Sequence, residues 1–201
     1  MSCNDEQIDA LKEIINIGVG QGANVLNEML GLHIQLSVPN ISILTPQQFS
    51  QTMASYYQDP LACIALPFKG NCRGNAQLVF PCETASRLIS ALVQDECLHS
   101  DMDSIRAAAF TEVGNIVLNA VMGTISNMLG FHLEYSMPDY TLTQVNDLLP
   151  REIRTEDTSI LLAKTRFSVE ALEVIGNIIL FVEVASFDEL IKAITQSSTA
   201  I

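Results

Sequence analysis

The chain has 201 residues, of which 48% are hydrophobic, and its formal net charge is −13 at pH 7. This length and composition fit a folded domain with a sizeable core and argue against a disordered chain. The negative charge argues against nucleic acid and anionic membranes as partners, and it favours a partner with a basic patch. The polar, acidic start lacks the features of a signal peptide, so we expect a cytoplasmic protein.

The first predicted element is a long helix over about residues 5–30. Asn4 and Gln7 have the spacing of a capping box, and Gly31 is a typical residue at a helix end. Heptad-like spacing predicts a buried stripe formed by Leu11, Ile15, Gly18, Gly22, Val25 and Met29. The opposite, polar stripe comprises Asp9, Glu13, Asn16, Gly20, Asn24 and Asn27.

Strand patterns follow this helix. We predict strands over residues 33–44, 63–67 and 75–80, with a hairpin marked by Gly70 and Gly74. The sequence leaves open whether the polar stretch 47–60 is ordered or forms a mobile loop near the first candidate site. A short amphipathic helix over 83–93 ends this half, and residues 95–104 form a polar joint.

The second half repeats the order. A long helix is predicted over 104–129, with Asp101 and Asp103 favouring its start and Gly130 its end. Its inward residues are predicted to be Phe110, Gly114, Val117, Val121 and Met128, and its outward ones Ala108, Glu112, Asn115, Asn119, Gly123 and Ser126. Strands are then predicted over 132–143, 159–167 and 172–184, followed by a helix over 188–195.

The uncharged stretch 113–133 is long enough for a membrane span. It contains Asn115, Asn119 and Asn127, which a helix facing lipid would tolerate poorly, so we predict a soluble helix and no membrane span.

The repeated order of helix, strands and helix predicts an α+β fold. We expect one domain over 1–201, built from duplicated half-domains over 1–98 and 99–201 that are related by a pseudo-two-fold axis. Their strands would join in one antiparallel sheet with the two long helices packed on it. The cysteines are Cys3, Cys63, Cys72, Cys82 and Cys97. They show neither Cys-x-x-Cys nor zinc spacing, so reduced core thiols are expected.

A polar motif is shared by the two halves. Glu13 and Asn16 recur 99 positions later as Glu112 and Asn115, and each asparagine is followed 23 positions later by a proline. Solvation of a helix surface would account for one such pair. It accounts less well for two, because Glu112 is the only charged residue between 107 and 133. A solvated face needs no particular polar residue.

The chemistry of the pair is limited to binding and orientation. Neither stripe contains a nucleophile with a base, and neither holds the carboxylate cluster of a metal site. An amide can hold a water molecule by donating and accepting hydrogen bonds, and a carboxylate can pair with a lysine. Both functions suit a protein that presents a helix to another protein's active site and orients water there.

The pattern Asp9-x3-Glu13-x2-Asn16-x22-Pro39 resembles the signature of the CheC/CheX/FliY chemotaxis phosphatases. The second copy, from Glu112 to Pro138, makes the chain most similar to CheC. The resemblance implies hydrolysis of the aspartyl phosphate of a CheY-type response regulator. Asn16 and Asn115 would position the water, and Glu13 and Glu112 would contact the regulator's lysine. It also implies no cofactor of its own, with Mg²⁺ bound by the regulator.

One position departs from the signature, because Ala108 stands where the first copy has Asp9. This difference puts the activity of the second site in doubt. The paired substitution Asn16→Ala and Asn115→Ala is expected to abolish activity and leave the fold intact. An alternative function is a non-catalytic adaptor for another chemotaxis protein, such as the CheD deamidase. The prolines are given a structural role in bending a strand.

Overall fold

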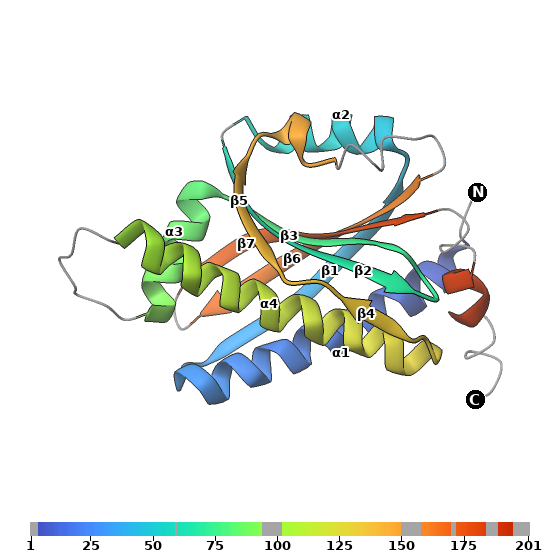
Figure 1. Cartoon of the computed structure of the whole chain (residues 1–201), viewed down its shortest axis with the longest axis horizontal. Helices are drawn as coiled ribbons and strands as arrows, with labels where there is room; N and C mark the ends of the chain where they lie inside the picture. Colours follow the sequence, from blue (N-terminus) through green and yellow to red (C-terminus); the bar gives the residue numbers. More distant parts are fainter. Residues whose placement is uncertain are drawn as a thin grey trace.

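Seven strands of this protein form one antiparallel sheet, with helices on both of its faces (Figure 1). The computed structural model describes residues 4–58, 60–93, 102–149, 158–169, 172–183 and 189–194. The helices are α1 (Asp5–Leu30), α2 (Pro46–Tyr56), α3 (Cys82–Val93), α4 (Met102–Leu129) and the 3₁₀ turn η1 (Val145–Asp147). The strands are β1 (Ile34–Leu44), β2 (Leu61–Gly70), β3 (Gly74–Pro81), β4 (Leu133–Tyr135), β5 (Asp139–Thr143), β6 (Thr158–Val169) and β7 (Leu172–Glu183).

The strand order interleaves the two halves of the chain. It reads β1-β6-β7-β3-β2-β4, with β5 also paired to β2. Exchanging each strand for its counterpart in the other half gives the same order read backwards, which is the order expected of a pseudo-two-fold fold. The predicted α+β class, with strands of both halves in one antiparallel sheet, is therefore confirmed.

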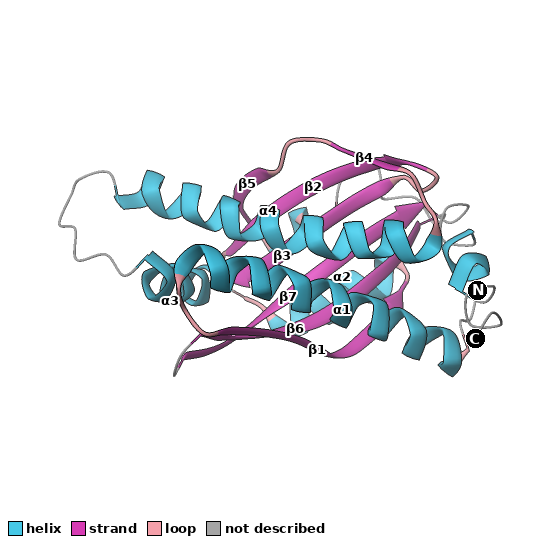
Figure 2. Ribbon diagram, turned by 90° about the horizontal axis from the view of Figure 1, so that it is seen from below, coloured by secondary structure: helices cyan, strands magenta, loops and turns pink. Residues whose placement is uncertain are grey.

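The two long helices lie side by side across one face of the sheet, and α2 covers the other face (Figures 1 and 2). A larger core joins α1, α3 and α4 to the sheet and includes Leu11, Ile15, Phe80, Val117 and Val121. A smaller core joins α2 to the opposite face. There the Phe49 ring stands edge-on to Phe181, with ring centroids 5.4 Å apart.

Local signals at the helix ends behave as predicted. The Asn4 side chain accepts a hydrogen bond from the Gln7 backbone N–H at 2.8 Å, and the Gln7 side chain accepts one from the Asn4 backbone N–H at 3.0 Å. These two bonds complete the capping box. Gly31 and Gly130 both have φ near 65°, the left-handed conformation that glycine adopts at a helix end.

Three residues predicted to face inward from the long helices are half-exposed. Val25 is 48% exposed, Met29 50% and Met128 48%. The buried stripe of α1 instead moves to Val19, Ala23 and Leu26. A straight helix has 3.6 residues per turn, so a stripe extrapolated at 3.5-residue spacing drifts around the helix by about 20° per heptad.

Residues 46–56 form α2, so most of the polar stretch 47–60, whose order the sequence left open, is an ordered helix. Thr45 and Gln48 make a second capping box, and Pro46 occupies the first turn, where its missing N–H costs nothing. The segment shows few apolar residues because only Phe49 and Met53 are buried. It lies on the face of the sheet away from α1, so it is not near the first candidate site (Figure 1).

The predicted strand 132–143 is two strands, β4 and β5, which are separated at Ser136–Pro138. The short C-terminal helix is present over residues 189–194, and the rest of the predicted 188–195 lies outside the described residues. The same holds for most of the joint 95–104, whose last residues belong to α4.

Three of the five cysteines lie in the described part of the chain, and all three are reduced. Cys63 and Cys72 are buried, as predicted, and Cys82 is half-buried. Burial raises the pKa of Cys63 to about 12 and that of Cys72 to about 11, because it disfavours the charged thiolate.

One helix, over Ser104–Leu129, is long and apolar enough to cross a membrane by length and composition alone. Half of its most apolar 18-residue window is buried inside the fold, where α4 packs against α1 and the sheet. Its apolar character therefore has an explanation in the core of a globular protein.

Glycines allow α1 and α4 to approach closely. A Cβ atom on Gly18 would lie 2.6 Å from the Val121 Cα atom, and one on Gly22 would lie 3.3 Å from the Val117 Cα atom. The helices therefore pack in antiparallel directions with their backbones near contact. Gly20, between these two positions, has open space around the place of a Cβ atom.

We expect Gly18→Ala to lower the free energy of unfolding by about 1–3 kcal/mol, because its methyl group would collide with the α4 backbone. The matched control is Gly20→Ala, which should raise stability by about 0.5–1 kcal/mol because alanine favours a helix and finds open space. Urea unfolding of both variants measures the difference. Equal stabilities would show that the helix contact is looser than described.

Candidate functional site

The two carboxylates of the sequence motif are exposed on the outer surfaces of the long helices. Glu13 lies on α1 and Glu112 on α4. Within the described part of the chain, neither makes a hydrogen bond or an ion pair. Asp9 is exposed one turn before Glu13, and Ala108 is exposed at the corresponding position of α4. Both glutamates are therefore free to pair with a cation on another protein.

Asn16, by contrast, is engaged inside the fold. Its Oδ1 atom accepts from the Val38 N–H at 2.8 Å, and its Nδ2 atom donates to the Val38 carbonyl oxygen at 3.0 Å. Nδ2 also donates to the Lys12 carbonyl oxygen at 2.9 Å. Both amide hydrogens and one lone pair are thus engaged: one hydrogen bonds within α1, and the two contacts with Val38 join α1 to β1. We call the Asn16–Val38 pair the α1–β1 bridge.

The α1–β1 bridge gives a physical reason for the spacing between Asn16 and Pro39. The pairing of β1 with β6 shifts between Ser37 and Asn40, so Val38 and Pro39 have no partners in the ladder. Proline has no N–H to pair, and such bulges tolerate it. Val38 is buried, and the Asn16 amide pairs with its N–H and carbonyl in place of a strand. Pro39 thus lies at an irregularity in the strand pairing, which fits the structural role predicted for it.

Asn27, near the C-terminal end of α1, makes a second contact of the same kind. Its Oδ1 atom accepts from the Ile34 N–H at 2.6 Å, and its Nδ2 atom donates to the Ile34 carbonyl oxygen at 3.2 Å. Asn16 and Asn27 therefore hold β1 to α1 at two points, both through backbone groups of the strand.

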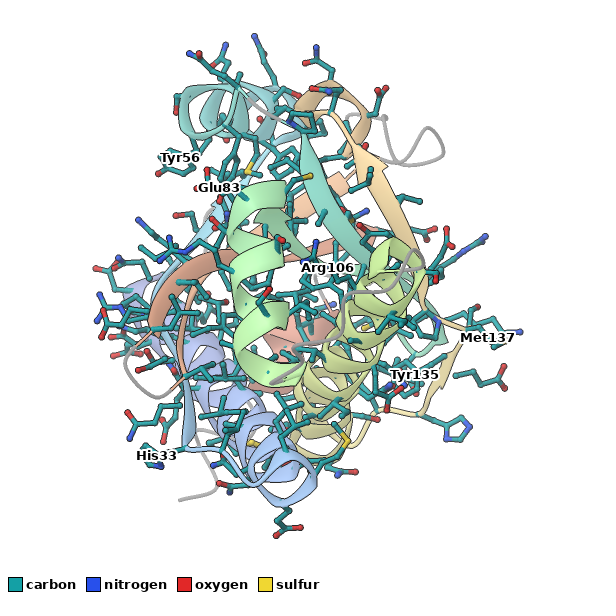
Figure 3. The ribbon with its side chains drawn as sticks, turned by 90° about the vertical axis from the view of Figure 1, so that its left-hand side faces the viewer. His33, Tyr56, Glu83, Arg106, Tyr135 and Met137 are labelled. Atoms are coloured by element: carbon teal, nitrogen blue, oxygen red, sulfur yellow. The ribbon has the colours of Figure 1, made fainter. Side chains whose placement is uncertain are left out.

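Asn115 has different neighbours. Its Oδ1 atom accepts from Asn119 Nδ2 at 2.5 Å, and no group among the described residues accepts a hydrogen bond from its own Nδ2. Met137, the counterpart of Val38, is 88% exposed and projects from the surface between β4 and β5 (Figure 3). Among the described residues of the second half there is therefore no bridge like that of Asn16, and the Asn115 NH₂ group remains available there.

The two pairs form separate sites. Because Gly18 lies against Val121 and Gly22 against Val117, Asn16 and Asn115 fall on opposite sides of the point where the helices cross. At 1.5 Å of rise per residue, they are separated by roughly 12 Å along the helix axes. One phosphoryl group could not contact both asparagines in this arrangement.

Sequence reasoning did not identify the residues that orient the two asparagines. Val38 carried no signal, because its role depends on backbone groups exposed by a bulge. Asn119 was placed in the polar stripe, and its distance of one helical turn from Asn115 is the usual spacing for an amide–amide contact. In the described part of the chain, no three His, Cys, Asp or Glu side chains gather as a possible metal site.

Asn16→Ala should lower the free energy of unfolding by about 2 kcal/mol or more, because it leaves the buried N–H and carbonyl of Val38 without partners. Asn115→Ala, which breaks no such bridge, should change it by less than about 0.5 kcal/mol. Urea unfolding checks both values. The paired substitution should then lose about as much stability as Asn16→Ala alone, and equal losses in the two single variants would contradict the bridge.

Comparison with known proteins finds a family model that matches the part of the sequence containing the first Glu–Asn pair, and a relative of similar sequence. The CheC-like family model matches residues 6–43, which include Glu13, Asn16 and Pro39. The CheY-P phosphatase CheC of Bacillus subtilis strain 168 is 25% identical over 141 residues, covering 69% of this chain and 67% of that protein.

Solved structures share the fold. FliY of Thermotoga maritima superimposes with a TM-score of 0.76 at 18% identity, covering 98% of this chain and 100% of that one. The FliM middle domain from H. pylori gives 0.67 at 11% identity, covering 95% and 99%. CheX in a CheX–CheY–BeF₃–Mg²⁺ complex from Borrelia burgdorferi gives 0.53 at 19% identity, covering 85% and 98%. The repeated motif, the CheC-like match over residues 6–43, the CheC relative and the shared fold together make this chain similar to the CheC/CheX/FliY chemotaxis proteins.

Proposed function

We propose that this protein is a cytoplasmic phosphatase that hydrolyses the aspartyl phosphate of a CheY-type response regulator. The observation that carries the proposal is the pair on α4, where the exposed Glu112 and the NH₂ group of the half-buried Asn115 have no hydrogen-bond or ion-pair partner among the described residues. The name of the Bacillus subtilis relative and the CheX–CheY complex support the choice of substrate.

The proposed reaction needs only orientation from this chain. Asn115 would hold a water molecule in line with the phosphorus atom, by donating from Nδ2 and accepting at the free lone pair of Oδ1. The water oxygen forms a bond to phosphorus, the bond from phosphorus to the regulator's aspartate oxygen breaks, and the aspartate leaves as a carboxylate. The products are the regulator and inorganic phosphate, which takes up or releases the remaining proton with the solvent.

Glu112 would provide the contact that brings the two proteins into register. An exposed carboxylate without an internal partner can pair with a lysine of the regulator's active site without first breaking another bond. The net charge of −13 adds a long-range attraction to a basic partner surface, and salt should weaken this attraction. The Mg²⁺ ion would belong to the regulator.

The first pair is less suited to the same reaction in this conformation. Both hydrogens of Asn16 Nδ2 are engaged, so Asn16 could only accept a hydrogen bond from water unless the α1–β1 bridge opens. We therefore assign most of the turnover to Glu112 and Asn115, and a smaller share to Glu13 and Asn16. This order is the opposite of the one suggested by Asp9 and Ala108 alone.

A second candidate is an adaptor that binds another chemotaxis protein, such as a CheD-type deamidase, with little turnover. The observation that favours it is the occupied amide of Asn16, together with the use of this fold by FliM in solved complexes with FliG and with SpeE. Under this alternative the exposed glutamates would serve recognition only.

Phosphate loss from a phosphorylated CheY-type regulator separates the two candidates. We expect catalytic amounts of the protein to accelerate the loss, and Asn115→Ala to reduce this acceleration by on the order of 10²-fold through loss of a transition-state contact. Asn16→Ala should have a smaller effect at a temperature where it stays folded. Asn127→Ala, an exposed position on the same helix, is the matched control.

Unchanged decay despite confirmed binding of the regulator would support the adaptor. Full activity of folded Asn115→Ala would refute the assignment of turnover to the second pair.

A further inference from the structure

The Asn119 side chain lies one helical turn after Asn115 and makes two hydrogen bonds to it. The single Nδ2 atom of Asn119 is 2.9 Å from the Asn115 carbonyl oxygen and 2.5 Å from Asn115 Oδ1. An NH₂ group has two hydrogens, so it can donate to both oxygens at once. Together the two bonds join the side chain of Asn119 to the backbone and to the side chain of Asn115.

These two hydrogen bonds determine which end of the Asn115 amide faces away from Asn119. A backbone carbonyl can only accept, so the Asn119 atom next to it must be nitrogen. The Asn115 atom that faces this nitrogen must then be oxygen, and the Asn115 NH₂ group is left on the other side. An exposed asparagine without such a partner rotates broadly about its last side-chain torsion and presents either end.

We propose that Asn119 is a positioning residue for Asn115, which holds the amide with its NH₂ group ready to bind the attacking water. The inference rests on the proposed function and assigns a further residue to the same site. Orientation before the substrate arrives matters, because a group that must reorganise during the reaction contributes less to the rate.

The two halves of the protein orient the repeated asparagine in different ways. In the first half, the counterpart of Asn119 is Gly20, which has no side chain, and the backbone of Val38 and Lys12 orients Asn16. That arrangement uses both hydrogens of the Asn16 amide. In the second half, the bonds that Asn119 makes to described residues go to the two oxygens of Asn115, so this way of orienting Asn115 leaves its NH₂ group unused.

A simpler explanation is that Asn119 bonds back to its own helix, as polar side chains often do four residues along. This accounts for the bond to the Asn115 carbonyl oxygen. It does not require the bond to Asn115 Oδ1, which joins one side chain to the other. The two explanations therefore differ in what happens to Asn115 when Asn119 is changed.

The test measures kcat and KM for dephosphorylation of a phosphorylated CheY-type regulator. Glu13→Ala serves as the background, because it weakens the first pair without touching the α1–β1 bridge. Asn119→Ala should lower kcat roughly 10-fold with KM unchanged, by analogy with residues that orient a functional side chain through a hydrogen bond without touching the substrate. Asn119→Asp should lower it further, because its carboxylate attracts the Asn115 NH₂ group inward. Asn127→Ala should have no effect.

The side-chain amide resonances of Asn115 provide a readout that does not depend on activity. Both Asn119 variants should shift them in ¹⁵N NMR spectra of the unbound protein, and Asn127→Ala should not. Unmoved resonances, or an unchanged kcat in Asn119→Ala while Asn115→Ala is impaired, would overturn the positioning role. Unchanged turnover in Asn115→Ala would instead overturn the proposed function, and with it any role of Asn119 in catalysis.

Discussion

The close antiparallel packing of α1 against α4 determines where both candidate sites lie. Gly18 and Gly22 allow the two helix backbones to come near contact, and the apolar faces of both helices are buried against the sheet. The remaining faces point outward on the same side of the molecule (Figure 2). Because the helices run in opposite directions, equivalent residues are displaced from the crossing point in opposite senses, and the two Glu–Asn pairs are held apart.

Within this symmetric frame, the same side chain performs two different tasks. Asn16 completes the hydrogen bonding of a bulged strand. Loss of these bonds would destabilise the fold, because the buried backbone groups of Val38 would be left unpaired. Asn115 makes no bond to a strand in the described part of the chain, and its neighbour by repeat position, Met137, is exposed to solvent. The spacing repeated within the sequence thus corresponds to a structural hydrogen bond in one half and to an available amide in the other.

The sequence predicted the features that depend on local chemistry. The capping box at Asn4, the left-handed glycines at both helix ends and the hairpin near Gly70 all follow from the preferences of single residues or short motifs. The duplicated pattern also led to the correct fold class, because two copies of an incomplete half can bury their apolar faces only by joining. The α2 capping box was as regular as the first, yet a weak apolar pattern around Phe49 and Met53 concealed it.

The sequence could not predict features that depend on which backbone groups meet in space. The state of Asn16 is decided by a bulge in the pairing of β1 with β6, whose strands are far apart in the chain. Likewise, the exposure of Val25 and Met128 depends on the accumulated rotation of a long helix, which spacing rules describe only approximately. The roles of Glu13, Asn16, Glu112 and Asn115 in chemistry remain predictions.

The interleaved strand order has a consequence for how the protein reaches its folded state. Ile34 near the start of the sheet pairs with Val169, and β2 pairs with β4 and β5 from the second half. Closing such long loops adds only modestly to the entropy cost, but pairing of distant segments slows folding. During synthesis, β1 must wait for β6 to emerge from the ribosome. The first half therefore leaves the ribosome with an unpaired strand edge, a state in which newly made proteins are prone to aggregate.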